Sequence, residues 1–488
     1  MYSSLTPVKN DSLADIMMKQ GEPGPPFMAP HRVSYREREE MMIMARKMVS
    51  MMLTLVMLLT VLAACSGNSE GNAESPQNET PPEGADAGAG NPADLKADLT
   101  WFGLASPEQF EERYGQHIKQ KFPNINITYI NQTDEQKLEQ VIASGTQIDM
   151  YLSSAGELRE DYVPANLALD LTALIEKHAV DISAIEPAYL EPVKIDGKVN
   201  LLPLSDNKFV MYYNKGIFDR FGVEYPKDGM TWDEALELSK KITRNEGGKQ
   251  YIGLWMSPKH YLRVAQNSAG FVDPETNKAT VNNDQWKFIF ENVFYDFTRD
   301  PGVQKRATED WLAHVDFNRD FIIGMYIYTS GWMQDAESSL AMDWDIAAVP
   351  TFKDMPGVNT QPNATYAGIS ALSKNQDAAM EVLKYLISEE YQTIMSKKGM
   401  ITPLTTQSVR DVAFSDYPFA SEKNIDALYY GKPAPSRVLT QFDEIVIEDA
   451  FDKDAVRQIA MGNLDVNTAL RRAEENANKL IQEQLSQK

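Results

Sequence analysis

Two groups of side chains that could bind a ligand stand at the ends of segments with strand-like alternation. Trp101 and Phe102 end the first such segment, and Ser153 and Ser154 directly follow the third. Open parallel sheets bind ligands at the carboxyl ends of their strands, so these four positions are candidate binding residues. Aromatic faces and hydroxyls suit a ligand with flat apolar faces edged by hydroxyl groups. For Ser154, plain N-capping of the next helix is the alternative.

Catalytic motifs are not found in the sequence. It contains no HExxH, no GxxxxGK[ST] and no GxSxG pattern. His117, His178, His260 and His314 are widely scattered, so we expect no metal site and no cofactor. Carboxylate pairs for glycoside hydrolysis have no fixed spacing along a chain, which keeps a glycan-processing enzyme open as an alternative.

The single cysteine, Cys65, has a position that predicts its chemistry. One cysteine excludes an intramolecular disulfide framework and the CxxC pairs of zinc or redox sites. Arg46 and Lys47 precede a charge-free apolar run, Val49–Ala64, that is short for a membrane span. The run therefore predicts the hydrophobic region of a signal peptide.

The sequence Leu-Ala-Ala-Cys that ends at Cys65 resembles the lipobox of bacterial lipoproteins. The resemblance implies a diacylglyceryl group on the sulfur, cleavage just before the cysteine, and a lipid anchor on the extracellular face of the cell membrane. We expect residues 41–64 to be the signal peptide and 65–98 to be the lipidated cysteine and a disordered linker, because 66–97 are polar and rich in Gly, Pro and Ala. Residues 1–40 are interpreted as an over-extended N-terminus, with an unusually long charged region as the alternative.

Composition limits the possible partners. The chain has 488 residues, a length that allows two to three domains, and 43% hydrophobic residues, as in globular proteins. Asp and Glu number 70 against 47 Lys and Arg, giving a net charge of −23. That field repels nucleic acid, so we expect none as a partner.

Strand and helix patterns alternate after Leu99. Such strand–helix–strand units predict an α/β fold with mostly parallel sheets covered by helices. The expected early elements are strands over 99–103, 125–130 and 148–152, and helices over 108–122 and 134–144. Thr231, Trp232 and Glu234 read as a capping box with a packing tryptophan.

Longer motifs resemble the extracellular solute-binding proteins of family 1, which include maltose- and oligosaccharide-binding proteins of ABC importers. The central motif begins LPLSDNKFVMYYNKGIFDRFGV at Leu202 and is followed by TWDEA at Thr231. Three more passages occur in the family's order: FNRDFIIGMYIYTSGW, DIAAVPTF with YAGISALSKN, and a helical passage over 377–389 that leads to Gly399 and Pro403. The resemblance covers nearly all of 99–487.

The resemblance implies a two-lobe, periplasmic-binding-protein-like fold of type II, with hinge crossovers and a ligand cleft between the lobes. Lobe I would comprise 99–206 and 367–414, and lobe II would comprise 207–366 and 415–488. Closure of two lobes around a solute buries it and changes the surface offered to a permease.

The same resemblance adds five candidate ligand-binding residues. Trp332 follows an expected strand that ends in Ser-Gly, where the family has a stacking aromatic, and Trp255 resembles a second aromatic at a strand end. Asp206 and Asn207 fall at the expected first hinge, and Tyr366 falls at the return crossover. Turn formation is the alternative for Asp206 and Asn207.

These patterns predict a monomeric, non-catalytic lipoprotein that binds a mono- or oligosaccharide and delivers it to the transmembrane subunits of an ABC permease. A sensory binding protein that reports to a histidine kinase is a further alternative, because the chain's own sequence does not separate sensing from transport.

Overall fold

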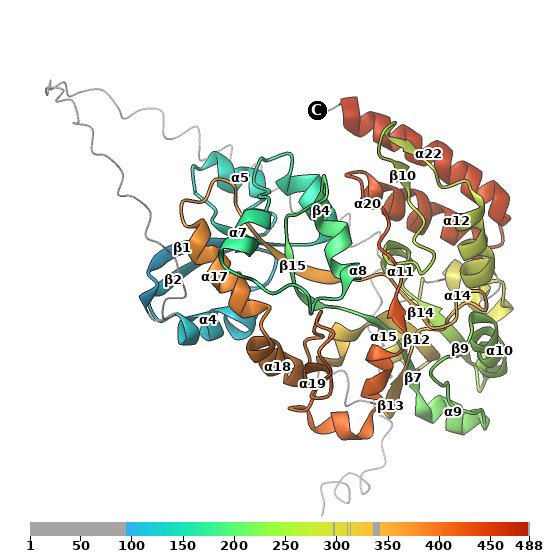
Figure 1. Cartoon of the computed structure of the whole chain (residues 1–488). Helices are drawn as coiled ribbons and strands as arrows, with labels where there is room; N and C mark the ends of the chain where they lie inside the picture. The colour runs from blue at the N-terminus through green and yellow to red at the C-terminus, as the bar shows by residue number, and fades with distance from the viewer. Residues whose placement is uncertain (1–93, 296–297, 310, 313, 335–341, 487–488) are drawn as a thin grey trace, which may run out of the picture. The chain divides into compact units, whose positions relative to one another are not determined.

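The computed structural model describes residues 94–486 except 296–297, 310, 313 and 335–341. The described residues contain two five-stranded sheets (Figure 1). The predicted signal peptide, Cys65 and the linker up to residue 93 lie outside the described residues. No helix within the described ranges is long and apolar enough to cross a bilayer.

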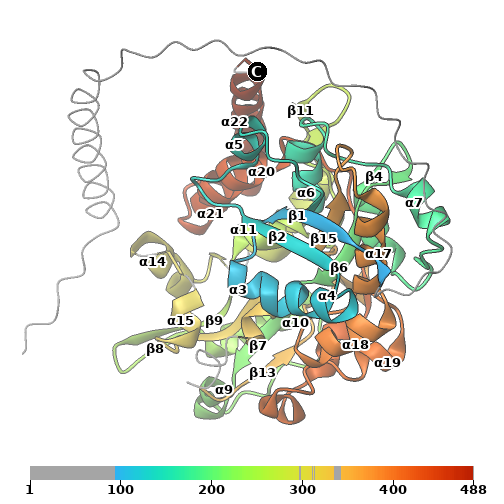
Figure 2. The ribbon, with the colours of Figure 1, turned by 90° about the vertical axis from the view of Figure 1, so that its left-hand side faces the viewer.

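The first sheet, called sheet 1, has the strand order β2-β1-β3-β15-β6. Its strands are β1 (Ala97–Gly103), β2 (Ile125–Asn131), β3 (Met150–Ser153), β6 (Leu202–Asp206) and β15 (Ala364–Ile369). β1 runs parallel to β2 and β3, whereas β15 runs antiparallel to β3 and β6. Figure 2 shows β1 and β2 side by side with α3 and α4 next to them.

The second sheet, called sheet 2, has the strand order β13-β7-β12-β9-β8. Its strands are β7 (Phe209–Asn214), β8 (Arg244–Glu246), β9 (Lys249–Met256), β12 (Ile323–Thr329) and β13 (Trp344–Ala347). Only β12 and β9 form a parallel pair, and β7 is antiparallel to both of its neighbours. The prediction of mostly parallel sheets is therefore wrong for sheet 2 and incomplete for sheet 1. The antiparallel strands β7 and β15 are those that the chain enters on passing from one sheet to the other.

Helices follow the strands of both sheets along the chain. Those connected with sheet 1 are α3 (Pro107–Phe110), α4 (Gln116–Lys121), α5 (Leu138–Ala143), α6 (Ala155–Glu157), α7 (Thr172–Lys177), α8 (Pro187–Leu190), α17 (Gln376–Leu386), α18 (Glu389–Lys397) and α19 (Gln407–Arg410). Those connected with sheet 2 are α9 (Lys215–Phe221), α10 (Trp232–Ile242), α11 (Pro258–Arg263), α12 (Asp284–Ile289), α14 (Pro301–Glu309), α15 (His314–Asn318), α20 (Asp443–Ile445), α21 (Arg457–Ala460) and α22 (Val466–Ser486). Four of these helices continue directly into a π-helical segment. The pairs are α3 with η3 (Glu111–Gly115), α6 with η4 (Leu158–Tyr162), α12 with η6 (Phe290–Tyr295) and α20 with η10 (Val446–Val456).

Short elements complete the described part. They are the strands β4 (Lys194–Ile195), β5 (Lys198–Val199), β10 (Val272–Asp273), β11 (Lys278–Ala279), β14 (Val358–Asn359) and β16 (Lys432–Pro433), and the 3-10 turns η5 (Glu191–Val193), η7 (Ser330–Gln334), η8 (Pro418–Glu422) and η9 (Ile425–Tyr429).

Capping side chains fix where several helices begin. Thr231 and Glu234 form the predicted capping box of α10, and the buried indole of Trp232 donates to Gln266 Oε1 at 3.0 Å. The predicted helix over 134–144 is shorter than expected. It begins at Leu138, because Gln140 Oε1 accepts from the amide of Lys137 and ends the preceding turn.

The two faces of sheet 1 carry separate apolar clusters. Trp101 packs on one face with Phe110 and Tyr114, at ring-centroid distances of 5.2 and 5.9 Å. Phe102, one residue later, lies in a cluster on the opposite face with Tyr151. This alternation is the two-residue period of a strand, and it buries both rings completely.

Close contact between α10 and β9 depends on a glycine. A Cβ added at Gly253 would lie 2.1 Å from the backbone oxygen of Ser239, and backbone atoms cannot move aside as a side chain can. We expect Gly253→Ala to lower the free energy of unfolding by about 3 kcal/mol, the upper part of the usual cost of overpacking. Chemical denaturation measures this change.

The matched control is Gly270→Ala, because a Cβ at Gly270 meets no atom within 4 Å. The control should unfold within about 0.5 kcal/mol of the unmodified chain. If both substitutions lowered the free energy of unfolding equally, the close contact between α10 and β9 would not be the cause of the loss.

Candidate functional site

A cavity of about 420 Å³ lies between segments connected with sheet 1 and segments connected with sheet 2. Sheet 1 contributes the residues after β3 and the start of β15, and sheet 2 contributes the end of α11. The loop before α20 and the first turns of the following helix close the remaining wall. The lining comprises Ser154, Ala155, Gly156, Glu157, Glu160, Pro192, Arg263, Val264, Gln361, Pro362, Asn363, Ala364, Tyr366, Ser436, Arg437, Leu439, Thr440, Asp443, Glu444 and Ile447.

A capping box places two carboxylates on the sheet 1 side of the cavity. The amide of Ser154 donates to Glu157 Oε2 at 2.7 Å, and the amide of Glu157 donates to Ser154 Oγ at 3.1 Å. This pair begins α6 directly after β3. Glu160 follows three residues later on η4, and residues three apart share one side of a helix. Glu157 and Glu160 therefore both reach the cavity.

The two chain crossovers meet beside the cavity. The amide of Asn207 donates to the Asn363 carbonyl at 3.1 Å, and Asn363 Nδ2 donates to the Asn207 carbonyl at 3.2 Å. The carboxylate of Asp206 accepts from the Asn363 amide at 3.0 Å and from the Tyr189 hydroxyl at 2.6 Å. Burial raises the pKa of Asp206, and the nearby Lys208 opposes that shift. These bonds hold the end of β6 to the residues that lead into β15.

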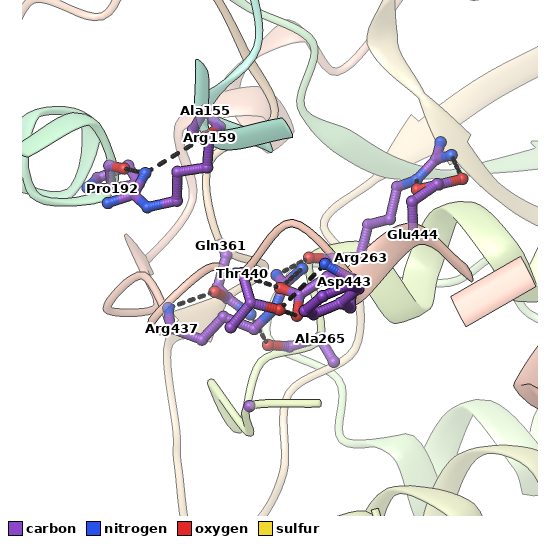
Figure 3. A network of polar contacts seen from close by, with 12 residues as sticks. Ala155, Arg159, Pro192, Arg263, Ala265, Gln361, Arg437, Thr440, Asp443 and Glu444 are labelled. Atoms are coloured by element: carbon purple, nitrogen blue, oxygen red, sulfur yellow. Dashed lines mark hydrogen bonds and ion pairs between the residues drawn. The ribbon is translucent and has the colours of Figure 1, made fainter. Parts of the chain in front are cut away.

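A charged network forms the wall made by the C-terminal segments (Figure 3). Arg263 Nε donates to Glu444 Oε2 at 2.9 Å, and Arg437 lies 3.5 Å from Asp443. The amide of Arg437 donates to Gln361 Oε1 at 2.8 Å, which ties this loop to the second crossover.

Further hydrogen bonds steady the same wall. The Arg437 guanidinium donates to the carbonyl of Arg263, and Thr440 Oγ1 donates to Asp443 Oδ1 at 2.7 Å. Gln361 Nε2 donates to the Ala265 carbonyl at 2.7 Å. The buried charges on this wall are thus paired with opposite charges or with backbone groups.

Glu160 is a carboxylate of the lining whose pKa is strongly raised. Burial raises its pKa to about 8, and the negative charges of Asp161, Glu444, Asp443 and Glu157 add to the shift. Burial also raises the pKa of Glu157. The lining therefore holds carboxyl groups that would be stabilised by donors or positive charge from a ligand.

Two of the predicted binding residues line this cavity and three lie next to it. Ser154 and Tyr366 are lining residues, although the Tyr366 ring is 1% exposed and its hydroxyl donates to the Tyr189 carbonyl at 3.0 Å. Ser153 is buried and donates to the Ser154 carbonyl at 2.8 Å. Asp206 and Asn207 lie at the crossover.

The other predicted residues lie elsewhere. Trp101, Phe102 and Trp255 are fully buried in the apolar clusters, and Trp255 Nε1 donates to the Leu312 carbonyl at 3.2 Å. Trp332 is half-buried against Tyr212, with ring centroids 4.8 Å apart. None of the four lines the 420 Å³ cavity, and their contact with a ligand stays a prediction.

The residue before Trp332 lines a second depression of the described surface. Gly331 lines a depression of about 370 Å³ together with Gln109, Arg113 and Met400. The backbone amide of Gly331 also donates to Asn207 Oδ1 at 2.7 Å.

Most of the charged lining was not predicted. Glu157 carried a signal, because Ser154 and Glu157 have the spacing of a capping box after a predicted strand. Arg263, Arg437 and Asp443 carried none, because their proximity to residues near 154 is produced only by tertiary structure. Within the described residues, no group of three or more His, Cys, Asp or Glu side chains could hold a metal ion.

Fold and site together define a class of protein: two sheets linked by paired crossovers, with a polar cavity between them, as in binding proteins that enclose a small solute. Residues 104–393, more than half of the chain, match the family described as bacterial extracellular solute-binding protein. The chain belongs to this family, which confirms the family resemblance and makes the protein a binding protein and not an enzyme.

Individual relatives agree with this membership. A Deinococcus radiodurans protein named as a probable ABC transporter-binding protein is 23% identical over 300 residues, covering 55% of this chain and 68% of the relative. A sugar transporter structure from Rhizobium etli, in an open conformation, is similar with a TM-score of 0.64 and 20% identity, covering 78% of this chain and 99% of that one. The cyclic alpha-maltosyl-1,6-maltose binding protein from Arthrobacter globiformis gives a TM-score of 0.63 and 19% identity, covering 79% and 99%. The predicted periplasmic-binding-protein-like α/β fold is confirmed.

The raised pKa of Glu160 predicts how stability depends on pH. The folded protein keeps the proton up to about pH 8, whereas an unperturbed glutamate loses it near 4.5. Between these values the folded state binds more protons, so the contribution of Glu160 to stability falls as pH rises. Glu160→Gln should therefore gain stability relative to the unmodified chain from pH 4.5 to 8.5, by a few degrees in melting temperature.

Differential scanning calorimetry across this pH range checks the prediction. The control Glu275→Gln changes an exposed glutamate in the turn between β10 and β11. A Glu160→Gln difference that is constant with pH would contradict the assigned shift.

Proposed function

We propose that this solute-binding protein binds a carbohydrate in the 420 Å³ cavity and delivers it to the transmembrane subunits of an ABC importer. The observation that carries the proposal is the cavity itself, which is lined by polar side chains from both halves next to the crossovers. The Rhizobium etli and Arthrobacter globiformis proteins are named for sugars, and the Deinococcus radiodurans protein is named for an ABC transporter.

The lining chemistry suits a polyhydroxylated ligand. Carboxylates, the side chains of Gln361 and Asn363, and the hydroxyls of Ser154 and Ser436 offer donors and acceptors around one space. Tyr366 is the aromatic residue of the lining, and its ring is almost completely covered. Recognition in this cavity therefore relies on hydrogen bonds more than on the aromatic stacking expected from the sequence.

The two halves act as lobes in this proposal. We assign 99–206 and 367–414 to lobe I, and 207–366 and 415–488 to lobe II. The passages from β6 to β7 and from β13 to β15 would be the hinge, since each carries the chain from one sheet to the other. Closure about these passages would bury the solute.

Attachment to the cell surface is part of the same proposal. Cleavage before Cys65 would leave a lipidated cysteine followed by a polar linker, on the extracellular face of the membrane. A diacylglyceryl group carries two chains, and two lipid chains give stable anchoring where one does not. The linker would give the lobes room to close near the permease.

Filling the cavity tests where the ligand binds. Leu439 lines the cavity, whereas the preceding residue, Val438, is 65% exposed and does not. Leu439→Trp should weaken sugar binding by at least about tenfold, equivalent to 1.4 kcal/mol, because the indole occupies the space of the ligand. Calorimetric titration with a panel of mono- and oligosaccharides first identifies the sugar and then measures the change.

The control for this experiment is Val438→Trp, which adds the same side chain one position away. It should bind the sugar as the unmodified chain does. Equal binding by both variants would place the ligand elsewhere, and the absence of binding by any sugar in the panel would refute the carbohydrate assignment.

Replacing the cysteine tests the anchor. Cys65→Ala removes the sulfur that would carry the lipid, so the protein should leave the membrane fraction of the producing cells while still binding its solute. Cell fractionation and mass spectrometry of the N-terminal peptide measure the two effects. Retention of the variant in the membrane would show that the apolar run before residue 65 is itself the anchor.

A further inference from the structure

The carboxylate of Glu160 is set apart from the other charged groups of the cavity lining. Its neighbours Arg263 and Glu444 pair with each other, as do Arg437 and Asp443. Glu160 has no hydrogen bond or ion pair with any described residue, although it lines the cavity and is half-buried. A half-buried carboxylate without a partner is costly, so a ligand that supplies donors or positive charge would gain binding energy there.

The charges that face Glu160 have the same sign from each side. Glu157 and Asp161 lie on its own helical segment, and Asp443 and Glu444 belong to α20 across the cavity. Their repulsion, together with burial, keeps the proton on Glu160 up to a pKa of about 8. A cation placed here would relieve this repulsion, whereas an anionic ligand would increase it.

The nearby cations are already engaged and do not compensate Glu160. Arg159 donates to the Pro192 carbonyl (Figure 3). It also donates to the Lys194 carbonyl at 2.9 Å, so its guanidinium is committed to the backbone. Arg263 is held by Glu444, and Arg437 is held by Asp443 and the Arg263 carbonyl. A positive charge next to an ionised Glu160 would therefore have to be supplied by the bound solute.

A second group of the lining also lacks a partner. The side chain of Arg437 is 7% exposed, and its buried Nε has no hydrogen-bond partner in the described part of the chain. A buried N–H without an acceptor is as unfavourable as a lost hydrogen bond. Arg437 Nε is itself covered by its surroundings, so the unmatched group of the lining that a ligand can reach is Glu160.

We propose that the solute is an amino sugar, whose ammonium group pairs with the carboxylate of Glu160 while its hydroxyl groups bond to the other polar side chains of the lining. This inference rests on the proposed carbohydrate function and narrows it to a cationic saccharide. A neutral sugar satisfies only the hydroxyl part of the site. A charge-assisted hydrogen bond to a carboxylate is about twice as strong as a neutral one, so the amine should decide the preference.

Calorimetric titration of the full chain at pH 7 tests the proposal with matched sugars. Glucose, galactose, mannose and their β-1,4-linked trisaccharides are each compared with the 2-amino and the 2-acetamido counterparts, and spermidine serves as an amine that is not a sugar. We expect each amino form that binds to do so at least about tenfold more tightly than its neutral and acetylated counterparts.

Proton release provides a second readout. At pH 7 Glu160 carries its proton in most free molecules, because its pKa is about 8. Pairing with an ammonium group ionises the carboxyl and releases the proton to the buffer, so the measured heat should differ between phosphate and Tris. A neutral sugar should give the same heat in both buffers.

Glu160→Gln keeps the size of the side chain and removes its charge. The variant should lose the preference for the amine, with amino and neutral forms binding within about threefold of each other, and should lose the dependence of the heat on buffer. Glu275→Gln should keep both properties, because this exposed residue lies away from the cavity lining.

The outcomes separate the two proposals. Neutral sugars that bind as tightly as their amino counterparts would overturn the amino-sugar inference and leave the carbohydrate function intact. If spermidine binds and no sugar does, or if nothing in the panel binds, the carbohydrate function fails and the inference fails with it. An unchanged amine preference in Glu160→Gln would show that another group makes the contact.

Discussion

The structure depends on one joint, where the chain passes twice between its two sheets. Asn207 lies on the outward passage and Asn363 on the return passage, and the two residues exchange hydrogen bonds. The carboxylate of Asp206 also accepts from the backbone amide of Asn363 on the return passage. Sheet 1 takes β15 from the chain after sheet 2, and the C-terminal helices return to pack on sheet 2, so neither half is made of one continuous segment. The cavity lies beside this joint, so a solute bound there contacts residues of both passages and both halves. This is why the geometry suits a protein that signals occupancy by closing.

The electrostatics of the cavity depend on the charged side chains of its two walls, which lie beside this joint. The C-terminal wall pairs its charges internally, as buried charges must, and leaves the sheet 1 wall with carboxyl groups that have no counter-ion. The chain as a whole carries a net charge of −23. Long-range attraction therefore favours positively charged solutes, and the local environment of Glu160 acts in the same direction.

The sequence predicted the fold better than it predicted the site. Strand alternation located β1, β2 and β3, and the capping box at Thr231 located the start of α10, because these signals are local. The direction of β7 and β15 was missed, since pairing across sheets depends on contacts far apart in the chain. For the site, position at a strand end was a poor guide to exposure. Trp101 stands at the end of β1, yet strand alternation directs its ring into the helix layer.

Most charged residues of the cavity lining could not be predicted from the sequence. Arg437 and Asp443 come from a loop and a helix far along the chain, and no periodic or spacing signal links them to Glu157 or Glu160. Ser154 was recognised, and its alternative role as a helix cap is what the structure shows. That cap is also what directs the two glutamates toward the cavity, so the structural and the functional interpretation of Ser154 are compatible.

Hydrogen–deuterium exchange of the full chain, with and without a bound sugar, tests most directly the claim that the solute binds between the two halves. Slower exchange is predicted together in 154–160 of the sheet 1 half, in 361–366 at the return crossover and in 436–447 of the C-terminal wall. Protection restricted to one half, or located away from these three segments, would contradict the account.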